Sequence, residues 1–207
     1  HSRVRDAVLG STAADDRRRR HRALADVLLA EAEPDADALV DQLLGAGDRA
    51  AAARFALVAA KRAHDTLAFD RAVHLYRVAL DAADSSAGAD GAYDARVQEP
   101  RWRIRARLAY ALVDAGRSRD AADAFARAAQ EAALEDQAAA ADLERCAAEQ
   151  FMRGGHIDEG IALIRRVLAA SSVPYPSTHA SAFATVLAHR ARLAVRGFRF
   201  RPRPAEQ

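Results

Sequence analysis

The side chains best suited to chemistry in this chain do not gather into a site. A bound metal ion needs three or four converging ligands, but the seven histidines are spread along the whole sequence. They are His1, His21, His64, His74, His156, His179 and His189. We therefore expect no metal site. Cys146 is the single cysteine, which excludes an internal disulfide, and we expect it to be a small buried apolar side chain.

Motifs that hold nucleotides or transfer phosphoryl groups are missing from the sequence. It contains neither the Gly-x-x-x-x-Gly-Lys-Ser/Thr loop that cradles phosphates nor Gly-x-Gly-x-x-Gly. A kinase catalytic loop and an Asp-Phe-Gly segment are also missing. Lys61, the only lysine, has no glycine loop before it. We expect no catalytic residue and no cofactor, which predicts that this segment is not an enzyme.

Two arginine-rich stretches could bind phosphate or nucleic acid. Arg17 to Arg20 are consecutive, so on a helix they fan around the cylinder and cannot all face one ligand. We favour a solvated face that pairs with nearby aspartates. Arg196 to Arg203 alternates arginine with Phe198 and Phe200, which could stack on single-stranded nucleic acid or, as we favour, dock on a neighbouring repeat. With 31 basic and 29 acidic residues, the chain lacks the basic excess of a general nucleic-acid binder.

The composition predicts an all-α protein. Apolar residues make up 51% of the chain and aromatic residues only 6%, so alanine and leucine must supply the core. Alanine is the best helix former, and its small side chain lets helices approach closely. No apolar run approaches the roughly 18 residues of a membrane span, and no signal peptide opens the chain. We therefore expect a cytoplasmic location.

A repeated pattern of residue sizes predicts antiparallel helical hairpins. A small residue is followed four positions later by a larger one, and three positions after that by another, usually small, residue. The three units are Ala72, Tyr76 and Ala79; Ala121, Phe125 and Ala128; and Gly160, Ile164 and Val167. Helices this thin cannot bury their own faces, so each pair must stack on its neighbours. We predict a stacked helical solenoid.

Caps, breakers and apolar spacing predict the element boundaries. The expected helices run from Ser11 or Thr12 to Glu31, Asp35 or Asp37 to Gly45 or Gly47, Asp48 to His64, Phe69 to Ala83, Pro100 to Gly116, Ser118 to Leu134, Glu135 to Arg153, Ile157 to Ala170, and Thr178 to Arg196. The first of these should bury Ala23, Leu24, Val27 and Leu28. Residues 1–10 should form a helix with one apolar face. Residues 84–99 and 171–177 should connect helices, and residues 198–207 should form a C-terminal tail.

These elements predict three regions and one binding groove. Residues 1–47 should link from an upstream domain, 48–170 should form three hairpins, and 171–207 should lead to further repeats. The first helices of stacked hairpins line the concave side. Their outward-facing residues are Arg54, Lys61, His64, Arg103, Tyr110, Arg145 and Glu149. This mostly basic groove suits an acidic peptide or another domain of the parent protein; the alternative is that these side chains are merely solvated.

The repeats resemble tetratricopeptide repeats. In the middle unit the matching residues are Leu108, Ala109, Leu112, Gly116, Ala121, Phe125 and Ala128. The first unit departs from the pattern because Leu67 stands where glycine is usual. The third has Gly160 and Ile164 in place of alanine and an aromatic residue. The resemblance implies a superhelical array that binds proteins or peptides.

The flanking segments resemble parts of large bacterial signalling proteins. Residues 1–8, His-Ser-Arg-Val-Arg-Asp-Ala-Val, resemble the end of the winged-helix part of P-loop signal-transduction ATPases, and 43–48 resemble the start of their helical repeats. Residues 190–200 resemble a stretch of multidomain serine/threonine kinases. The layout also resembles LuxR-type transcription regulators.

This resemblance implies a non-catalytic regulatory module of a signal-transduction ATPase or serine/threonine kinase. The alternative is the sensor region of a LuxR-type regulator, where a small inducer binds inside the superhelix. Partner binding would bias an upstream switch, an expectation that rests on analogy between folds. The chain starts without methionine, and we expect it to be a segment of a longer protein.

Overall fold

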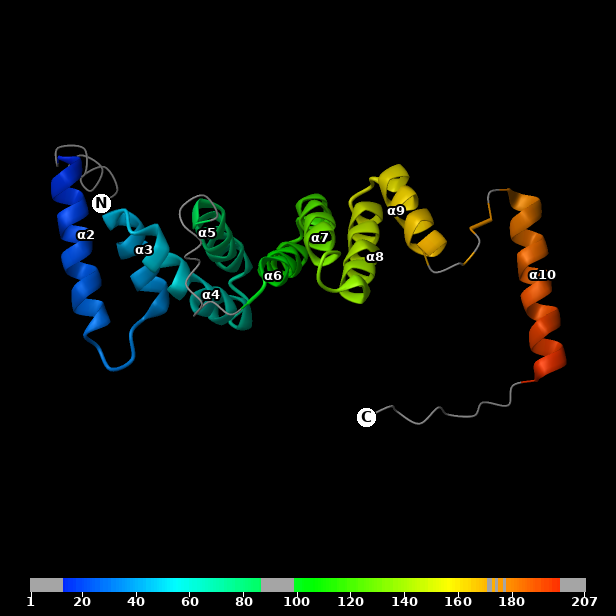
Figure 1. Ribbon diagram of the computed structural model, residues 1–207, viewed down its shortest axis with the longest axis horizontal. Coiled ribbons are helices and arrows are strands. Elements are labelled where there is room, and N and C mark those ends of the chain that lie inside the picture. Colours follow the sequence, from blue (N-terminus) through cyan, green and yellow to red (C-terminus); the bar gives the residue numbers. More distant parts are fainter. Residues whose placement is uncertain (1–12, 87–98, 171–172, 174, 177, 198–207) are drawn as a thin grey trace. The chain divides into compact units, whose positions relative to one another are not determined.

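The computed structural model describes residues 13–86, 99–170, 173, 175, 176 and 178–197, and all regular secondary structure among them is α-helical. Within these ranges no strand occurs, and the all-α prediction is confirmed. The helices are α2 (Ala14–Leu29), α3 (Ala36–Ala46), α4 (Arg49–Asp65), α5 (Phe69–Ser86), α6 (Arg101–Asp114), α7 (Ser118–Ala132), α8 (Gln137–Arg153), α9 (Ile157–Ala170) and α10 (His179–Arg196) (Figure 1).

The chain divides into two compact units, His1–Ile164 and Arg165–Gln207. Several predictions fall on segments outside the described residues. They are the helix at 1–10, the Ser11 or Thr12 cap, most of the connections at 84–99 and 171–177, and the tail at 198–207 with Phe198 and Phe200. These predictions stay untested, as do the three predicted regions 1–47, 48–170 and 171–207.

Aspartate side chains begin three of the helices. The Asp35 carboxylate accepts a hydrogen bond from the Asp37 backbone N–H at 3.1 Å, so Asp35 rather than Asp37 caps α3. Asp48 caps α4 in the same way, as predicted. Asp136 caps α8, which therefore starts at Gln137 and not at Glu135. Each cap satisfies one of the backbone donors that a helix leaves unpaired at its start.

Four helix ends share one backbone motif. A residue one or two positions after the helix has a positive φ, and its N–H and the next N–H bond back to carbonyls of the last turn. This residue is glycine after α3, α6 and α8, where Gly47, Gly116 and Gly155 have φ of 83°, 73° and 82°. After α4 it is Leu67, with φ of 62°. The Leu67 N–H donates to the His64 carbonyl at 2.9 Å, so leucine adopts the conformation that glycine takes elsewhere.

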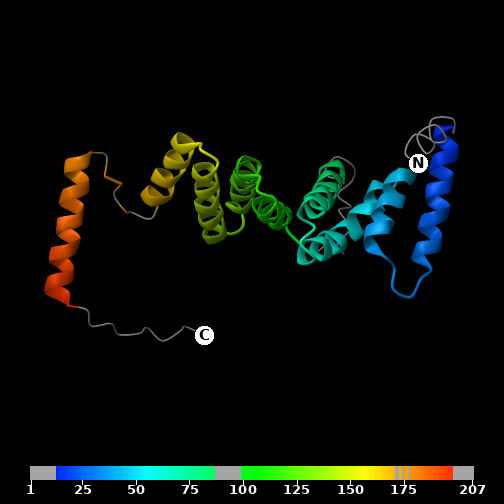
Figure 2. The same ribbon diagram turned by 180° about the vertical axis from the view of Figure 1, so that it is seen from behind.

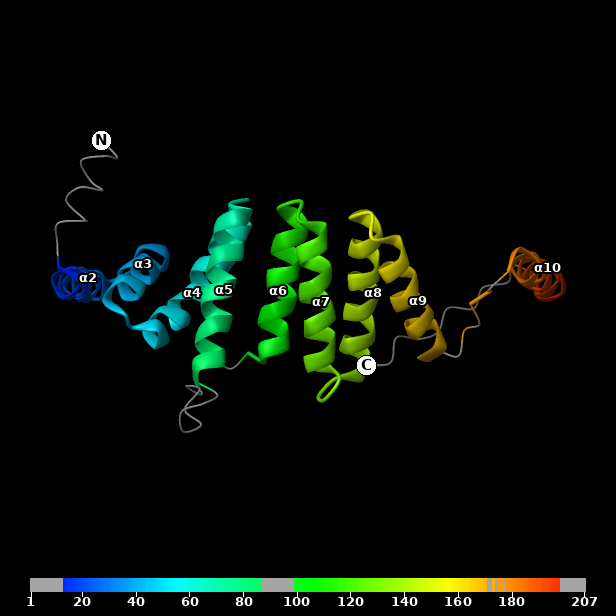
Figure 3. The ribbon, with the colours of Figure 1, turned by 90° about the horizontal axis from the view of Figure 1, so that it is seen from above.

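Helices of the unit His1–Ile164 pack in chain order. Each helix from α2 to α7 packs against the next one, and the chain can be followed from blue to yellow-green in both views (Figure 1, Figure 2). Figure 3 shows α5, α6, α7 and α8 side by side. This sequential packing is the part of the predicted hairpin stacking that the structure confirms.

Contacts between alternate helices show that this unit has two layers. His64 of α4 lies 2.8 Å from Asp114 of α6, and Tyr110 of α6 lies close enough to Cys146 of α8 for each side chain to affect the pKa of the other. These pairs join α4, α6 and α8. On the other side, Arg71 of α5 forms an ion pair with Asp41 of α3 at 2.9 Å, while Arg119 of α7 lies 3.7 Å from Glu159 of α9. First and second helices of the hairpins therefore lie in different layers.

Small residues occupy the points where these helices cross. Ala72 and Ala121 are completely buried, and Gly160 is also buried. A Cβ added to Gly160 would lie 2.5 Å from Met152 Cγ and 3.0 Å from the Ala148 carbonyl oxygen, so α9 approaches α8 too closely for alanine without a shift. The predicted small positions are thus confirmed as packing positions. Phe125, buried beside Ala121, is among the largest fully buried side chains.

The predicted apolar face of α2 is only partly right, because Leu28 packs against the core but the other three predicted residues are exposed. We expected Ala23, Leu24, Val27 and Leu28 to be buried, but Leu24 is 53% and Val27 65% exposed, and the buried residue is Ala25. The face toward α3 is set by His21, whose Nδ1 lies 2.8 Å from Gln42 Oε1. The His21 ring also fills the space where Gly45 would carry a Cβ. The side of α2 that faces α3 therefore carries His21 and Ala25, whereas Leu24 and Val27 are exposed.

In the unit Arg165–Gln207, Thr178 caps α10 through a reciprocal pair of hydrogen bonds with Ser181. The α10 helix leaves large apolar side chains exposed, with Phe183 at 67% and Val195 at 91%. The Arg165 guanidinium lies 4.9 Å from the centre of the Tyr175 ring. No residue of α10 is buried.

Candidate functional site

The predicted groove residues lie on α4, α6 and α8, the three helices that form one layer of the unit His1–Ile164. Arg54, Lys61 and His64 belong to α4, Arg103 and Tyr110 to α6, and Arg145 and Glu149 to α8. The contacts between His64 and Asp114 and between Tyr110 and Cys146 bring these helices together. We call the outward side of this layer the α4/α6/α8 face.

The α4 part of this face carries exposed cations. Arg54 and Lys61 are exposed, and His64 is half-buried. His64 Nε2 lies 2.8 Å from the Asp114 carboxylate, and its ring stands edge-on to Phe69 with centres 5.5 Å apart. Among the described residues, Lys61 has no ion-pair partner. The α4 part therefore keeps an excess of positive charge for a ligand.

The α6 part adds an aromatic surface. The Tyr110 ring is 48% exposed and stands edge-on against Phe125, with ring centres 5.0 Å apart. Burial of its inner side, together with the neighbouring Cys146, raises the pKa of Tyr110, so the hydroxyl stays protonated at neutral pH. The Arg103 guanidinium lies 5.0 Å from the Trp102 ring, a distance suited to a cation–π contact. Tyr110 is thus held in place while half of it remains available.

The charges of α8 are balanced within the helix. Arg145 lies 2.9 Å from Asp142 and 3.6 Å from Glu149. Glu149 also binds Arg153 at 2.9 Å. The first of these contacts raises the pKa of Arg145, so the guanidinium stays charged. Since each of the two predicted α8 residues already has charged partners, this end of the face offers less net charge than the α4 and α6 end.

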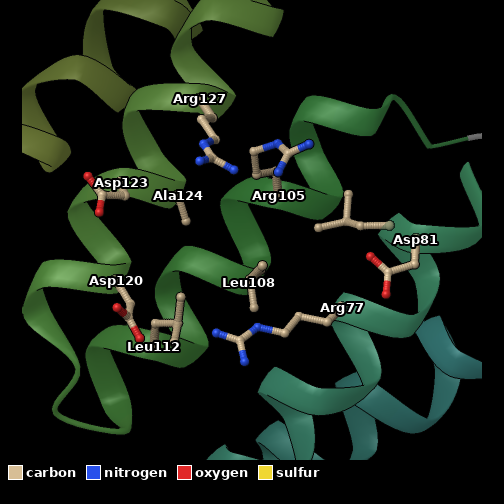
Figure 4. A pocket seen from close by; sticks show the side chains of 10 residues that line it. Arg77, Asp81, Arg105, Leu108, Leu112, Asp120, Asp123, Ala124 and Arg127 are labelled. Atoms are coloured by element: carbon tan, nitrogen blue, oxygen red, sulfur yellow. The ribbon is translucent and has the colours of Figure 1, made fainter. Parts of the chain in front are cut away.

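The sequence did not predict a cleft on the opposite side of α6. Successive residues of a helix turn by about 100°, so Arg105, Leu108 and Leu112 point away from Arg103 and Tyr110. These three residues form the floor of a cleft of about 450 Å³ whose walls come from α5 and α7 (Figure 4). We call it the α5–α6–α7 cleft. Its charged residues are Arg77, Asp81, Arg105, Asp120, Asp123 and Arg127.

Four of the six charged residues of the α5–α6–α7 cleft already have interaction partners. Arg105 is only 11% exposed, and its guanidinium binds Glu131 at 2.9 Å. Asp120 accepts a hydrogen bond from Arg117 at 3.0 Å, and Asp123 accepts one from Arg119 at 3.3 Å. Asp81 also has an interaction partner.

Two guanidinium groups differ from this pattern. Arg77 of α5 and Arg127 of α7 are exposed and have no ion-pair partner among the described residues. Figure 4 shows both side chains reaching into the space above α6. The groove was predicted only from outward-facing residues on the first helix of each hairpin, whereas Arg77 and Arg127 lie on second helices. Their lack of an ion-pair partner within the described part of the chain is the one feature that distinguishes them, and it can be recognised only in the structure.

No three His, Cys, Asp or Glu side chains converge into a possible metal site within the described ranges. In the same part of the chain, none of the helices combines the length and the apolar character needed to cross a bilayer.

Comparison with known proteins adds no relative. No protein-family model matches this chain, and neither a curated protein nor a solved structure matches it. The resemblance to tetratricopeptide repeats and to signalling ATPases therefore stays a prediction from the motifs. The features of this chain that bear on function are therefore the charges and contacts of the α4/α6/α8 face and of the α5–α6–α7 cleft.

Proposed function

We propose that this segment is a non-catalytic protein-binding module whose helical hairpins stack as a tetratricopeptide-like solenoid. In this proposal the α4/α6/α8 face holds an acidic segment of a partner protein or of another domain of the same polypeptide. The parent protein would be a bacterial signal-transduction ATPase or serine/threonine kinase, as the flanking motifs imply. Binding would then bias the state of the domain that carries out the chemistry.

One observation carries the proposal. The α4/α6/α8 face joins exposed cations, Lys61 and Arg103, to a half-exposed Tyr110 ring that its neighbours hold in place. Acidic side chains of a ligand would pair with the cations, and an apolar side chain would cover the ring. Aromatic residues and arginines of this kind are enriched in the parts of protein interfaces that matter most for affinity.

The inducer-sensing alternative requires an enclosed apolar pocket. The α5–α6–α7 cleft has six charged residues among those that line it (Figure 4). This observation favours the protein-binding reading over a small apolar inducer.

The test is a binding titration with an acidic peptide. The probe is a short peptide in which glutamate alternates with leucine, labelled with a neutral dye and followed by fluorescence anisotropy; its glutamine counterpart is the control ligand. Exposed ion pairs contribute up to about 1 kcal/mol each, so Lys61→Gln/Arg103→Gln should weaken binding by about tenfold. Raising the ionic strength should weaken it further, because salt screens exposed charges.

A matched variant controls for total charge. Arg18→Gln/Arg20→Gln removes two exposed cations from α2, away from the face. It should leave the affinity within about twofold of the parent, since charges beyond a Debye length of about 10 Å are screened. Equal losses in both double variants would show a general charge effect and refute binding at the α4/α6/α8 face.

A further inference from the structure

We propose that the α5–α6–α7 cleft is a second binding site, specific for an acidic peptide segment of a partner protein. It lies on the opposite side of α6 from the α4/α6/α8 face and does not depend on the function proposed for that face. Each side can therefore be tested while the other is left intact.

Charge is the first reason. Of the three guanidinium groups in the cleft, Arg105 is bound to Glu131, whereas Arg77 and Arg127 have no ion-pair partner among the described residues. Asp120 and Asp123 at the rim accept hydrogen bonds from Arg117 and Arg119, Asp81 has an interaction of its own, and none of the three forms an ion pair with Arg77 or Arg127. The cleft therefore presents two unmatched positive charges that an anionic ligand would satisfy.

Geometry is the second reason. Arg77 and Arg127 approach from opposite walls, above a floor formed by Leu108 and Leu112 (Figure 4). From Arg105 to Leu112 the floor is roughly 10 Å long at 1.5 Å per residue. This length accommodates about three residues of an extended peptide at roughly 3.3 Å each. The planar guanidinium fork binds a carboxylate through two parallel hydrogen bonds, so two acidic side chains can be held at once.

The rim carboxylates decide between a peptide and a nucleic acid. Asp81, Asp120 and Asp123 lie among the arginines, and a nucleic acid would bring a phosphate close to them at every nucleotide. A peptide can place glutamate opposite each arginine and neutral residues opposite the aspartates. Because aspartates lie among the arginines of this cleft, it favours a peptide whose carboxylates are separated by neutral residues over a nucleic acid with a phosphate at every nucleotide.

The experiment uses the whole chain and the labelled glutamate–leucine peptide. The parent for this test is the Lys61→Gln/Arg103→Gln variant, so that binding which remains must lie away from the α4/α6/α8 face. Adding Arg77→Gln/Arg127→Gln should lower the remaining affinity by about tenfold. Adding Arg18→Gln/Arg20→Gln, an equal change of charge on α2, should alter it by less than about twofold.

A conservative variant separates charge from shape. Arg77→Lys/Arg127→Lys keeps both charges but loses the planar forks, so its affinity should fall between those of the parent and the glutamine variant. Arg77 and Arg127 are exposed, and their replacement removes no ion pair between described residues. Far-UV circular dichroism and thermal unfolding should therefore match the parent, which shows that lost binding is not lost folding.

Three results would overturn the inference. The first is unchanged binding in Arg77→Gln/Arg127→Gln; if Lys61→Gln/Arg103→Gln still weakened binding to the otherwise unaltered chain, the function proposed for the α4/α6/α8 face would stand. The second is displacement of the peptide by inorganic phosphate at the same concentration, which would indicate a small-anion site. The third is binding of a single-stranded DNA oligonucleotide that depends on the same two arginines, which would replace the peptide by a nucleic acid.

Discussion

Leu67 offers the sharpest test of the backbone conformation between α4 and α5. Its φ is 62°, a left-handed value that the other helix ends of this motif reserve for Gly47, Gly116 and Gly155. A side chain with a Cβ pays about 1–2 kcal/mol for this conformation, whereas glycine adopts it freely. The perturbation is a pair of substitutions, Leu67→Gly and Leu67→Ala, at the same position.

The expected free-energy changes follow from three terms. Leu67 is 72% exposed, so removing the side chain forfeits roughly a quarter of the 1.5–3 kcal/mol that full burial of a leucine provides, or about 0.5 kcal/mol. Both substitutions lose this term. Glycine relieves the left-handed strain, which raises the free energy of unfolding by about 1–2 kcal/mol. Glycine also makes the unfolded chain more flexible, which lowers the free energy of unfolding by about 0.5–1 kcal/mol. Leu67→Gly should therefore lie within about 0.5 kcal/mol of the parent, and Leu67→Ala about 0.5–1 kcal/mol below Leu67→Gly.

Urea unfolding followed by far-UV circular dichroism measures these differences, and hydrogen exchange of α4 and α5 shows whether the change is local. The matched control is the exposed mid-helix residue His74 of α5. There the order should reverse, with His74→Ala more stable than His74→Gly by about 1 kcal/mol. If Leu67→Ala were at least as stable as Leu67→Gly, the left-handed conformation of Leu67 would be refuted.

Two further predictions concern helix packing and helix capping. Gly160→Ala should destabilise the unit by up to about 2 kcal/mol in urea unfolding, because overpacking against Met152 costs about 1–3 kcal/mol and exceeds the gain in helix propensity of about 1 kcal/mol. The double variant Gly160→Ala/Met152→Ala should recover part of this loss, and no recovery would contradict the close approach of α8 and α9. Asp48→Ala should lower the free energy of unfolding by about 1 kcal/mol at neutral pH because it removes a cap. The hydrogen bond from the Ala51 backbone N–H, helped by Arg22, lowers the pKa of Asp48, so its contribution is complete above about pH 4 and disappears as the pH falls through the lowered value. Asp48→Asn, which caps without titrating, should flatten this acid dependence, and a persistent slope would assign it to other groups.

Local signals in the sequence were enough to predict the helices. Asp48, the Gly154-Gly155 pair and Gly197 mark boundaries that depend on neighbouring backbone groups only, so they can be read without knowing the tertiary structure. The buried positions Ala72 and Ala121 were predicted because a small residue is required wherever two helices cross. These features are repeated along the chain, and each repetition supports the others.

The orientation of α2 and the α5–α6–α7 cleft depend on contacts between distant residues. The contact of His21 with Gln42, and its fit over Gly45, joins residues of two helices, and no periodicity of apolar residues reveals it. Leu24 and Val27 suggested the wrong face because hydrophobicity was the only signal available. In the cleft, Arg77 and Arg127 look like ordinary surface arginines until the pairing of their neighbours is known.

The sequence was enough to predict which residues lie on α4, α6 and α8, but not which of their charges are paired with neighbouring side chains. The sequence gives Arg145 and Glu149 the same weight as Lys61, because all of them face outward. The structure separates them, since Arg145 and Glu149 pair with each other and with Asp142 and Arg153, while Lys61 has no such partner among the described residues. Whether this face binds a ligand stays a prediction.

Local pairing, more than the number of arginines, determines where this chain attracts an acidic ligand. A net charge of +2 looks too small for an anion-binding protein, but the field at a surface is set by charges within a Debye length of about 10 Å. Glu131 cancels the charge of Arg105, and the carboxylates of α8 cancel those of that helix. Among the cations without an ion pair between described residues are Lys61 and Arg103 on one side of α6 and Arg77 and Arg127 on the other. A near-neutral chain can therefore offer two separate anion-attracting surfaces, and because each has only a few charges, a peptide with spaced carboxylates fits them better than a continuous phosphate backbone.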